Sequence, residues 1–387
     1  MIGFLVGIIR HECSRTVAYL PWYSISPFIC WLDILFGKKL LSEPIVIFLT
    51  LFFITSCGGG STESGSSPQI LERETPKLTT TSEEDSRKIT LEPDCEDLPS
   101  ETIIVDGQVE VEASIKRCIA INDELDRIFY IFIPKTYSNT VDYQPLLFSL
   151  HGYGSTAVFH MRYTGFKEVA SKEGFIAIFP QGSILKSAGT THWNVGGWTR
   201  GSTSDDVGFI NDIIDFMTVN YRIDTDRIYS TGMSNGGFMS YHLACNLSEK
   251  IAAVASVTGS MTPETYNSCE PDRPISIMQI HGSHDEVVPY LGNQTMKSID
   301  EVMDYWRQNN RCNEVPEIQI LPDLTNDKLG GSQTSYLDCQ NDTEIILYLL
   351  DGLAHRWPLE NEADVDAPST IWQFLSRYDR YGRIFSQ

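Results

Sequence analysis

The sequence has few basic residues and no recognisable metal-binding pattern. It contains 29 Lys and Arg against 51 Asp and Glu, which gives a formal net charge of −22. Such an acidic surface repels nucleic acids and anionic lipids, so both are excluded as natural ligands, and we interpret the charge as favouring solubility. No Cys-x-x-Cys motif and no paired Cys/His spacing occurs among nine cysteines, so no zinc site is expected.

The apolar segment near the N-terminus is too short to span a membrane. Lys38 and Lys39 precede the apolar residues 45–55, and Ile54-Thr55-Ser56-Cys57 follows. The run is well short of the roughly 20 residues that span a bilayer. The order of these parts is typical of a lipoprotein signal, so we predict a signal region over residues 1–57 and lipidation at Cys57. An uncleaved membrane anchor is the alternative.

This signal predicts an exported protein, anchored to the outer membrane or cell surface or else secreted. Gly58 rather than Asp follows the cysteine, so nothing indicates retention at the inner membrane. Residues 1–37 do not fit a signal, and no methionine occurs between Met1 and Met161. One hypothesis is that most of residues 1–37 are not translated and that the true start lies near Ile34 or Leu35. The other is that they form an additional hydrophobic segment.

Residues 58–94 are rich in Gly, Ser, Thr, Glu and Pro. This composition cannot bury enough apolar surface to fold, so we predict a flexible acidic linker. Folding is expected to begin near Cys95. No second linker or internal repeat follows, and residues 95–387 are predicted to form one domain.

Within that domain, apolar and β-branched runs alternate with segments of helical periodicity. The predicted strands are residues 127–134, 145–152, 175–180, 227–231, 251–259, 275–282 and 344–350. The predicted helices are residues 164–174, 205–221, 235–245, 294–310 and 368–378. Alternating strands and helices predict an α/β fold with a mostly parallel central sheet and helices on both faces.

One serine stands between glycines where a strand meets a helix. Residues 232–236 read Gly-Met-Ser-Asn-Gly, a G-x-S-x-G motif in a strand–turn–helix context. A strained turn there lifts the serine hydroxyl clear of the sheet, and the helix N-terminus favours developing negative charge. Ser234 is therefore the predicted nucleophile, the alternative being a plain glycine-rich turn.

A nucleophilic serine needs a base, and the base needs an acid to orient it. In this context the chain order is Ser, acid, His. Asp285 follows the strand at 275–282 and His355 follows the strand at 344–350, so both are predicted at the same sheet edge as Ser234.

Other acids and histidines fit less well. His281 and His284 precede Asp285, which breaks the order, and Asp351 follows the strand that should be the last. We expect His160 and His192 at the surface or at the rim of a pocket.

The two donors for an oxyanion are predicted to be backbone N–H groups. One is that of Asn235, which follows the nucleophile. The other is that of Tyr153, in the His-Gly-Tyr-Gly loop at residues 151–154. The alternative for this loop is a tight turn without a catalytic role.

Together these residues resemble a known family. The segments LHGYGS, FPQG, WNVGGW, DDVGFI, RIYSTGMSNGGFMSYHLAC, HGSHDEVVPY and GLAHRWP are similar to the polyhydroxybutyrate depolymerases and the feruloyl and acetylxylan esterases of the α/β-hydrolase fold. The resemblance implies a serine esterase with the triad Ser234, Asp285 and His355, and no metal or cofactor. Leu359 and Trp198 stand where relatives often have Gly and Cys, and the resemblance implies that both positions border the substrate pocket.

The expected substrates are feruloyl or acetyl esters of plant polysaccharide, or hydroxybutyrate oligomers or polymer. Trp193, Trp198 and Trp357 are predicted to line the substrate site, together with Tyr153. The alternatives are a catalytically inactive surface binding protein on the same scaffold and a peptidase of the same fold. The expected protein is a monomer that contacts the membrane only through its lipid.

Six cysteines of the domain form an even set, which in an exported chain favours disulfides. Sequential pairing closes the short loops Cys95–Cys118, Cys245–Cys269 and Cys312–Cys339, and we predict these three bonds. The alternative is free buried thiols.

Overall fold

The computed structural model describes residues 91–105, 108–360 and 362–385. The predicted signal region, the lipidation site Cys57 and nearly all of the predicted linker lie outside these residues. Leu91 is already buried in the core, so the folded domain includes residues slightly before the predicted start at Cys95.

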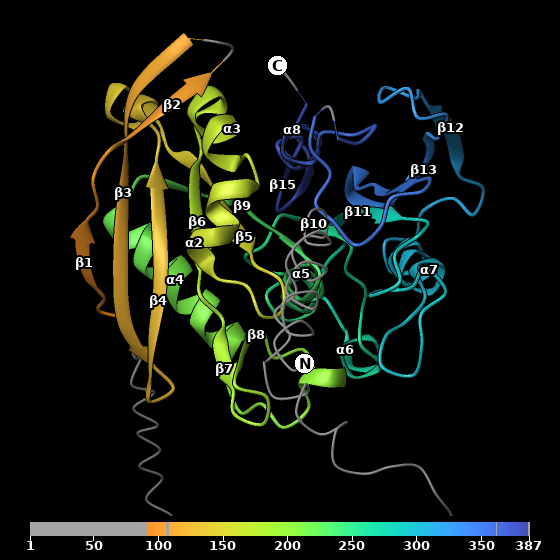
Figure 1. The fold of residues 1–387 in the computed structure, drawn as a ribbon, viewed down its shortest axis with the longest axis horizontal. Coiled ribbons are helices and arrows are strands. Elements are labelled where there is room, and N and C mark those ends of the chain that lie inside the picture. The colour runs from red at the N-terminus through yellow and green to blue at the C-terminus, as the bar shows by residue number, and fades with distance from the viewer. Residues whose placement is uncertain (1–90, 106–107, 361, 386–387) are drawn as a thin grey trace, which may run out of the picture. The chain divides into compact units, whose positions relative to one another are not determined.

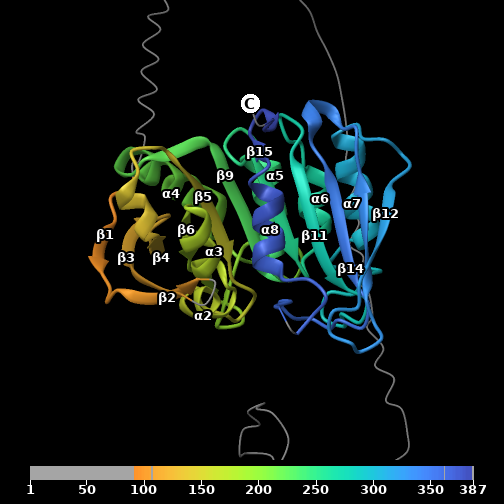
Figure 2. The ribbon, with the colours of Figure 1, turned by 90° about the horizontal axis from the view of Figure 1, so that it is seen from above.

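Six parallel strands form the centre of a twelve-stranded mixed sheet (Figures 1 and 2). In spatial order they are β6 (Ile176–Pro180), β5 (Gln144–Leu150), β9 (Ile223–Met233), β10 (Ala253–Val257), β11 (Ser276–Gly282) and β14 (Ile345–Leu350). Five of them are buried at almost every position, as expected for strands covered on both faces. Each was predicted, and the predicted α/β-hydrolase fold class is confirmed.

Antiparallel strands extend this sheet at both edges. At one edge lie β4 (Leu125–Ile133), β3 (Gln108–Asn122), β2 (Glu101–Val105) and β1 (Asp94–Asp97). At the other edge lie β13 (Gly331–Tyr336) and β12 (Glu317–Leu321). Of these six strands, only β4 was predicted from the sequence.

Helices cover both faces, as Figure 2 shows. One face carries α4 (Asp206–Asn220), α5 (Asn235–Asn246), α6 (Pro263–Ser268) and α7 (Ile299–Asn309). The other carries α2 (Ala157–Tyr163), α3 (Phe166–Glu173) and α8 (Ala367–Leu375). A separate apolar core fills the space on each face of the sheet. None of the helices in the described residues combines the length and apolarity needed to cross a membrane.

The remaining elements are short. Two hairpins are formed by β7 (Ser183–Leu185) with β8 (Thr190–His192), and by β15 (Tyr378–Asp379) with β16 (Gly382–Arg383). Three 3₁₀ turns, η1 (Lys135–Asn139), η2 (Gly197–Thr199) and η3 (Gln340–Asp342), complete the described chain.

All three predicted disulfides are confirmed. Cys95–Cys118 joins directly opposed residues of β1 and β3, and Cys245–Cys269 links the last turn of α5 to the residue after α6. Cys312–Cys339 connects the chain after α7 to the start of η3. Because each bond spans 23 to 27 residues, the chain-entropy model assigns each a contribution of roughly 3 kcal/mol.

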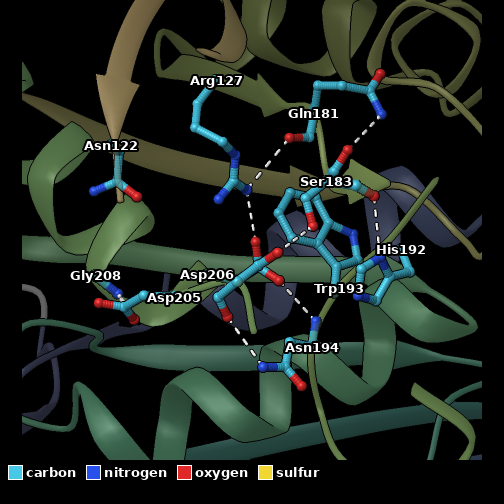
Figure 3. Close-up of polar contacts among 12 residues, drawn as sticks. Asn122, Arg127, Gln181, Ser183, His192, Trp193, Asn194, Asp205, Asp206 and Gly208 are labelled. Carbon is cyan, nitrogen blue, oxygen red and sulfur yellow. Dashed lines mark hydrogen bonds and ion pairs between the residues drawn. The ribbon is translucent and has the colours of Figure 1, made fainter. Parts of the chain in front are cut away.

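A buried ion pair attaches the start of α4 to β4 (Figure 3). Arg127 Nη2 donates to Asp206 Oδ1 at 2.6 Å, and both side chains are almost fully buried. Asp206 Oδ2 also accepts from the N–H of Asn194 at 2.7 Å. Asp205, by contrast, is the exposed N-cap of α4 and accepts from Gly208 N–H. Of the two aspartates at the start of this helix, only Asp205 caps it.

This difference predicts unequal effects of two neighbouring substitutions. Asp206→Asn leaves the Arg127 charge buried without its partner, so the free energy of unfolding should fall by about 3–5 kcal/mol. Asp205→Asn retains a good N-cap and should change it by less than about 0.5 kcal/mol. Urea unfolding of the two oxidised variants measures both values, and equal effects would contradict the role assigned to the ion pair.

Candidate active site

Ser234 occupies the sharp turn between β9 and α5. Its φ of 54° and ψ of −122° are unusual for a residue with a side chain, as expected of a strained nucleophile turn. The Ser234 N–H donates to the carbonyl of Val257 at the end of β10, at 2.8 Å. The predicted position of this serine at the carboxyl edge of the sheet is therefore what the structure shows.

The two glycines of the motif are required by close backbone contacts. A Cβ atom on Gly232 would lie 2.5 Å from the carbonyl carbon of Gly236, and one on Gly236 would lie 2.0 Å from the Leu150 oxygen. Both distances are too short for any side chain. The first turn of α5 consequently lies directly against the end of β5.

The loop after β5 lies beside the serine as a result. A Cβ atom built on Gly152 would be 3.4 Å from Ser234 Cβ. In the described residues, neither the Tyr153 N–H nor the Asn235 N–H donates a hydrogen bond. Both predicted oxyanion donors thus remain candidates that border the nucleophile from two different elements.

Asp285 and His355 are in direct contact. The loops after β11 and β14 meet, and His355 Nδ1 donates to Asp285 Oδ2 at 2.8 Å. Asp285 Oδ1 accepts from the N–H groups of Val287 and Val288 at 3.0 and 2.8 Å. Burial alone would raise the pKa of Asp285, but the hydrogen bonds from His355 and Val288 outweigh it and lower the pKa. Asp285 is therefore an ionised acceptor that orients His355.

The competing groups have other partners or are exposed, and the nearest of them, His281, has its Nε2 3.8 Å from Asp285 Oδ2. His281 is fully buried: Nε2 donates to the Val288 carbonyl at 2.8 Å and Nδ1 accepts from Gln279. It therefore supports the loop that carries Asp285. Asp351 and His284 are exposed. Among the described residues Ser234 Oγ forms no hydrogen bond. The structure thus shows the bond between acid and base directly, whereas it shows only that Ser234 lies at the same edge of the sheet. Contacts of this kind often tighten only when substrate binds.

Two of the predicted substrate-contacting tryptophans are core residues. Trp193 is fully buried, and Trp357 is 5% exposed and packs edge-on against His160 and Phe166. Neither ring has the surface needed to contact a substrate, which corrects both predictions. Trp198 is partly exposed and packs edge-on against Phe238 of α5, and Tyr153 is 39% exposed, so both remain candidates for a substrate-facing surface.

The prediction that His160 and His192 lie at the surface was wrong. His160 is fully buried, where its ring contacts Ser149 Oγ at 3.0 Å and Tyr163 Oη at 3.0 Å. Tyr163 Oη in turn donates to the Sδ atom of Met233, which directly precedes the nucleophile. His192 is equally buried between the Ser183 carbonyl and Ser202. The sequence gives no direct sign of such burial, because the fold alone brings the hydroxyl and carbonyl partners of these histidines around them.

Nothing in the described residues suggests a metal centre, because no cluster of three His, Cys, Asp or Glu side chains could hold an ion. The chemistry available at this edge is that of a serine, an acid–base pair and two free N–H groups.

Comparisons with known proteins agree with this description. Residues 133–312 match the Phospholipase/Carboxylesterase family model. The chain is 27% identical over 259 residues to a bifunctional acetylxylan esterase/xylanase of Neocallimastix patriciarum, covering 67% of this chain and 34% of that protein. It is 28% identical over 189 residues to feruloyl esterase D of Neurospora crassa, covering 47% of this chain and 59% of that protein. The predicted resemblance to these esterases is confirmed.

A solved structure supports the fold. The acetyl xylan esterase of Aspergillus awamori superposes with a TM-score of 0.50 at 15% identity, over 68% of this chain and 98% of that one. This likeness shows the α/β-hydrolase fold of the chain.

Three buried histidines and the partly exposed His242 predict a loss of stability in mild acid. Burial lowers the pKa of His151 and His242 to about 4, and lowers those of His160 and His281 as well. In the unfolded chain all four titrate near pH 6.5, at about their ordinary pKa. Below that pH the unfolded state binds more protons, so the free energy of unfolding should decrease by up to about 1.4 kcal/mol per pH unit per histidine.

Urea unfolding between about pH 7 and about pH 5.5 tests this expectation. Burial raises the pKa of Asp206 and Asp212, so these two carboxyl groups stabilise the folded state as the pH falls. The four histidines outnumber them, and the net effect of acid should be a loss of stability. His242→Gln should flatten the dependence, whereas the exposed His284→Gln should leave it unchanged. A stability that is constant or rises over this range would contradict the assignment.

Proposed function

We propose that this chain, with its α/β-hydrolase fold and its resemblance to feruloyl and acetylxylan esterases, is a serine carboxylic-ester hydrolase acting through an acyl-enzyme. The observation that carries the proposal is the hydrogen bond from His355 to an ionised Asp285 at the sheet edge where Ser234 stands in its strained turn. The chain covers 34% of the length of the acetylxylan esterase/xylanase and 59% of the length of feruloyl esterase D.

In the proposed mechanism, Ser234 Oγ attacks the ester carbonyl and His355 Nε2 accepts the serine proton. Asp285 keeps the proton of His355 on Nδ1, so that Nε2 is free to act as the base, and it stabilises the imidazolium that forms. The N–H groups of Tyr153 and Asn235 donate to the developing oxyanion. The alcohol leaves with the proton from His355. Water, deprotonated by His355, then attacks the acyl-enzyme, and Ser234 Oγ takes the proton back as the carboxylic acid leaves.

A cavity with several hydroxyl side chains in its lining favours polysaccharide esters as the substrate class, and none of its lining residues belongs to the proposed triad. It has a volume of about 680 Å³ and lies at the beginning of β4 and the β7–β8 hairpin, with Ser183, Ser202, Thr203 and Ser204 in its lining. Gly182 also lines it and donates to the ring of His151 in the oxyanion loop. Hydroxyl groups of this kind suit the sugar part of a feruloyl or acetyl ester. Hydroxybutyrate oligomers are the second class of ester substrate that we consider.

Activity assays with substituted variants test the function. The wild-type protein should hydrolyse p-nitrophenyl acetate together with methyl ferulate or acetylated xylo-oligosaccharide, assayed beside a hydroxybutyrate trimer. Ser234→Ala should lower kcat by on the order of 10⁶, as loss of the nucleophile does in a comparable triad. It should also abolish labelling by a fluorophosphonate.

Two aspartates provide the matched control. Asp285→Asn should lower kcat by about 10⁴, because the histidine then takes the wrong tautomer. Asp351 is much closer to His355 in sequence than Asp285 is, but it is exposed, so Asp351→Asn should leave kcat unchanged. Equal losses in the two variants would remove Asp285 from the triad, and full activity of Ser234→Ala would refute the mechanism.

We also propose that the protein is exported as a lipoprotein, on the basis of the Ile54-Thr55-Ser56-Cys57 sequence alone. The mature chain should then begin at a lipid-modified Cys57, and residues 58–94 should act as a tether for the esterase domain. Mass spectrometry of the N-terminal peptide checks this prediction in cells that process lipoproteins, with Cys57→Ser as the unprocessed control. An unmodified peptide that spans Ser56 and Cys57 in the mature wild-type protein would contradict it.

A further inference from the structure

The first oxyanion donor is oriented by the histidine that precedes it. Tyr153 N–H belongs to the same peptide group as the Gly152 carbonyl, and His151 Nδ1 contacts that carbonyl at 2.8 Å. The N–H of Gly182 donates to His151 Nε2 at 2.9 Å, so Nε2 is the acceptor and Nδ1 carries the proton. Holding the Gly152 oxygen in place fixes the direction of the Tyr153 N–H, because the peptide group is planar.

The second donor is fixed by its own side chain. Asn235 Oδ1 accepts from Trp193 N–H at 2.7 Å, and Asn235 Nδ2 donates to the Trp193 carbonyl at 3.1 Å. Both bonds are buried, and together they attach the first residue of α5 to the backbone that follows the β7–β8 hairpin. The backbone N–H of Asn235 therefore cannot move independently of Trp193.

Trp193 also contacts the loop that carries the first donor. Its indole Nε1 donates to the His151 carbonyl at 2.9 Å, and its ring lies 5.1 Å from the His151 ring, centroid to centroid. Trp193 thus binds the loop of residues 151–154, which carries Tyr153 N–H, through its side chain, and it binds Asn235 through its main chain. We refer to these three hydrogen bonds as the Trp193 bridge.

An indole N–H in this core is not bonded as a matter of course. In the described residues, Trp306 Nε1 and Trp357 Nε1 are buried without a hydrogen-bond partner. Trp306 is as deeply buried as Trp193 but lies on α7, where its ring stacks on Tyr241. The bond from Trp193 is therefore a specific feature of this position and not a general property of buried tryptophans in the protein.

We propose that Trp193 is a positioning residue that sets the spacing of the two oxyanion donors, Tyr153 N–H and Asn235 N–H. The inference rests on the proposed esterase function, since it concerns the same site. Trp193 touches no reacting atom. Because the oxyanion develops only after the serine attacks and is absent from the bound ester, weakening the Trp193 bridge lowers kcat and leaves KM nearly unchanged.

Trp193→Phe tests the inference, with Trp306→Phe as its control. Both substitutions keep an aromatic ring in a fully buried site, but only the first removes a hydrogen bond. Loss of a whole oxyanion donor lowers kcat by about 10²–10³, so a donor that is merely displaced should lower it by about tenfold or more. Trp306→Phe should retain the wild-type kcat. Equal kcat values in the two variants would overturn the inference.

Inhibitors separate positioning from a general loss of structure. An arylboronic acid forms a tetrahedral serine adduct, so its Ki in Trp193→Phe should rise by the same factor as kcat/KM falls. The Ki of the carboxylic acid product, which has no tetrahedral oxyanion, should stay unchanged. A parallel rise of both Ki values would show that the whole pocket is disturbed and would contradict a positioning role.

A second variant covers the other half of the bridge. Asn235→Ala removes both bonds to the Trp193 main chain and keeps the backbone N–H, so it should show the same fall in kcat. Because both substitutions loosen one bridge, the double variant should lose less than the product of the two single effects. Independent, multiplicative effects would overturn the inference. A wild-type protein without ester turnover or Ser234 labelling would instead overturn the proposed function, and this inference with it.

Discussion

The contact between Gly236 and the Leu150 carbonyl is the constraint on which the site depends. A Cβ at Gly236 would lie only 2.0 Å from the Leu150 oxygen, so α5 begins directly against the end of β5. That approach brings the loop after β5 next to Ser234, and with it the Tyr153 N–H. It also leaves the N-terminus of α5, with its unpaired N–H groups, facing the same point. The strained backbone of Ser234 follows from the sharp turn that this packing requires.

Much of this arrangement could be predicted from the sequence because its signals are local. The G-x-S-x-G motif needs only its strand–turn–helix context, and the order of Ser234, Asp285 and His355 follows from which strands they succeed. The structure confirms the hydrogen bond between Asp285 and His355, while the serine–histidine contact stays a prediction. The disulfide pairs were predictable because pairing the six cysteines in sequential order closes three short loops, and the structure shows this pairing.

Long-range contacts explain what the sequence did not reveal. The unpredicted strands lie at the sheet edges, where strands such as β12 are exposed at four of five positions and lack the continuous apolar runs of central strands. Trp193 was predicted to contact substrate, because nothing local distinguishes a substrate-facing indole from one that donates to a buried carbonyl 42 residues away. Likewise, the burial of His160 depends on Ser149 of β5, Phe179 of β6 and Trp357, and no spacing rule indicates these contacts.

The most direct test of the account is a crystal structure of the protein after reaction with a phosphonate ester, which leaves a tetrahedral group on Ser234. The account predicts that the phosphonyl oxygen accepts hydrogen bonds of about 2.7–3.1 Å from both Tyr153 N–H and Asn235 N–H. His355 Nε2 should then lie within hydrogen-bond reach of Ser234 Oγ, with Asp285 still bound to Nδ1. A phosphonyl oxygen that points into solvent, or an adduct on another residue, would contradict it.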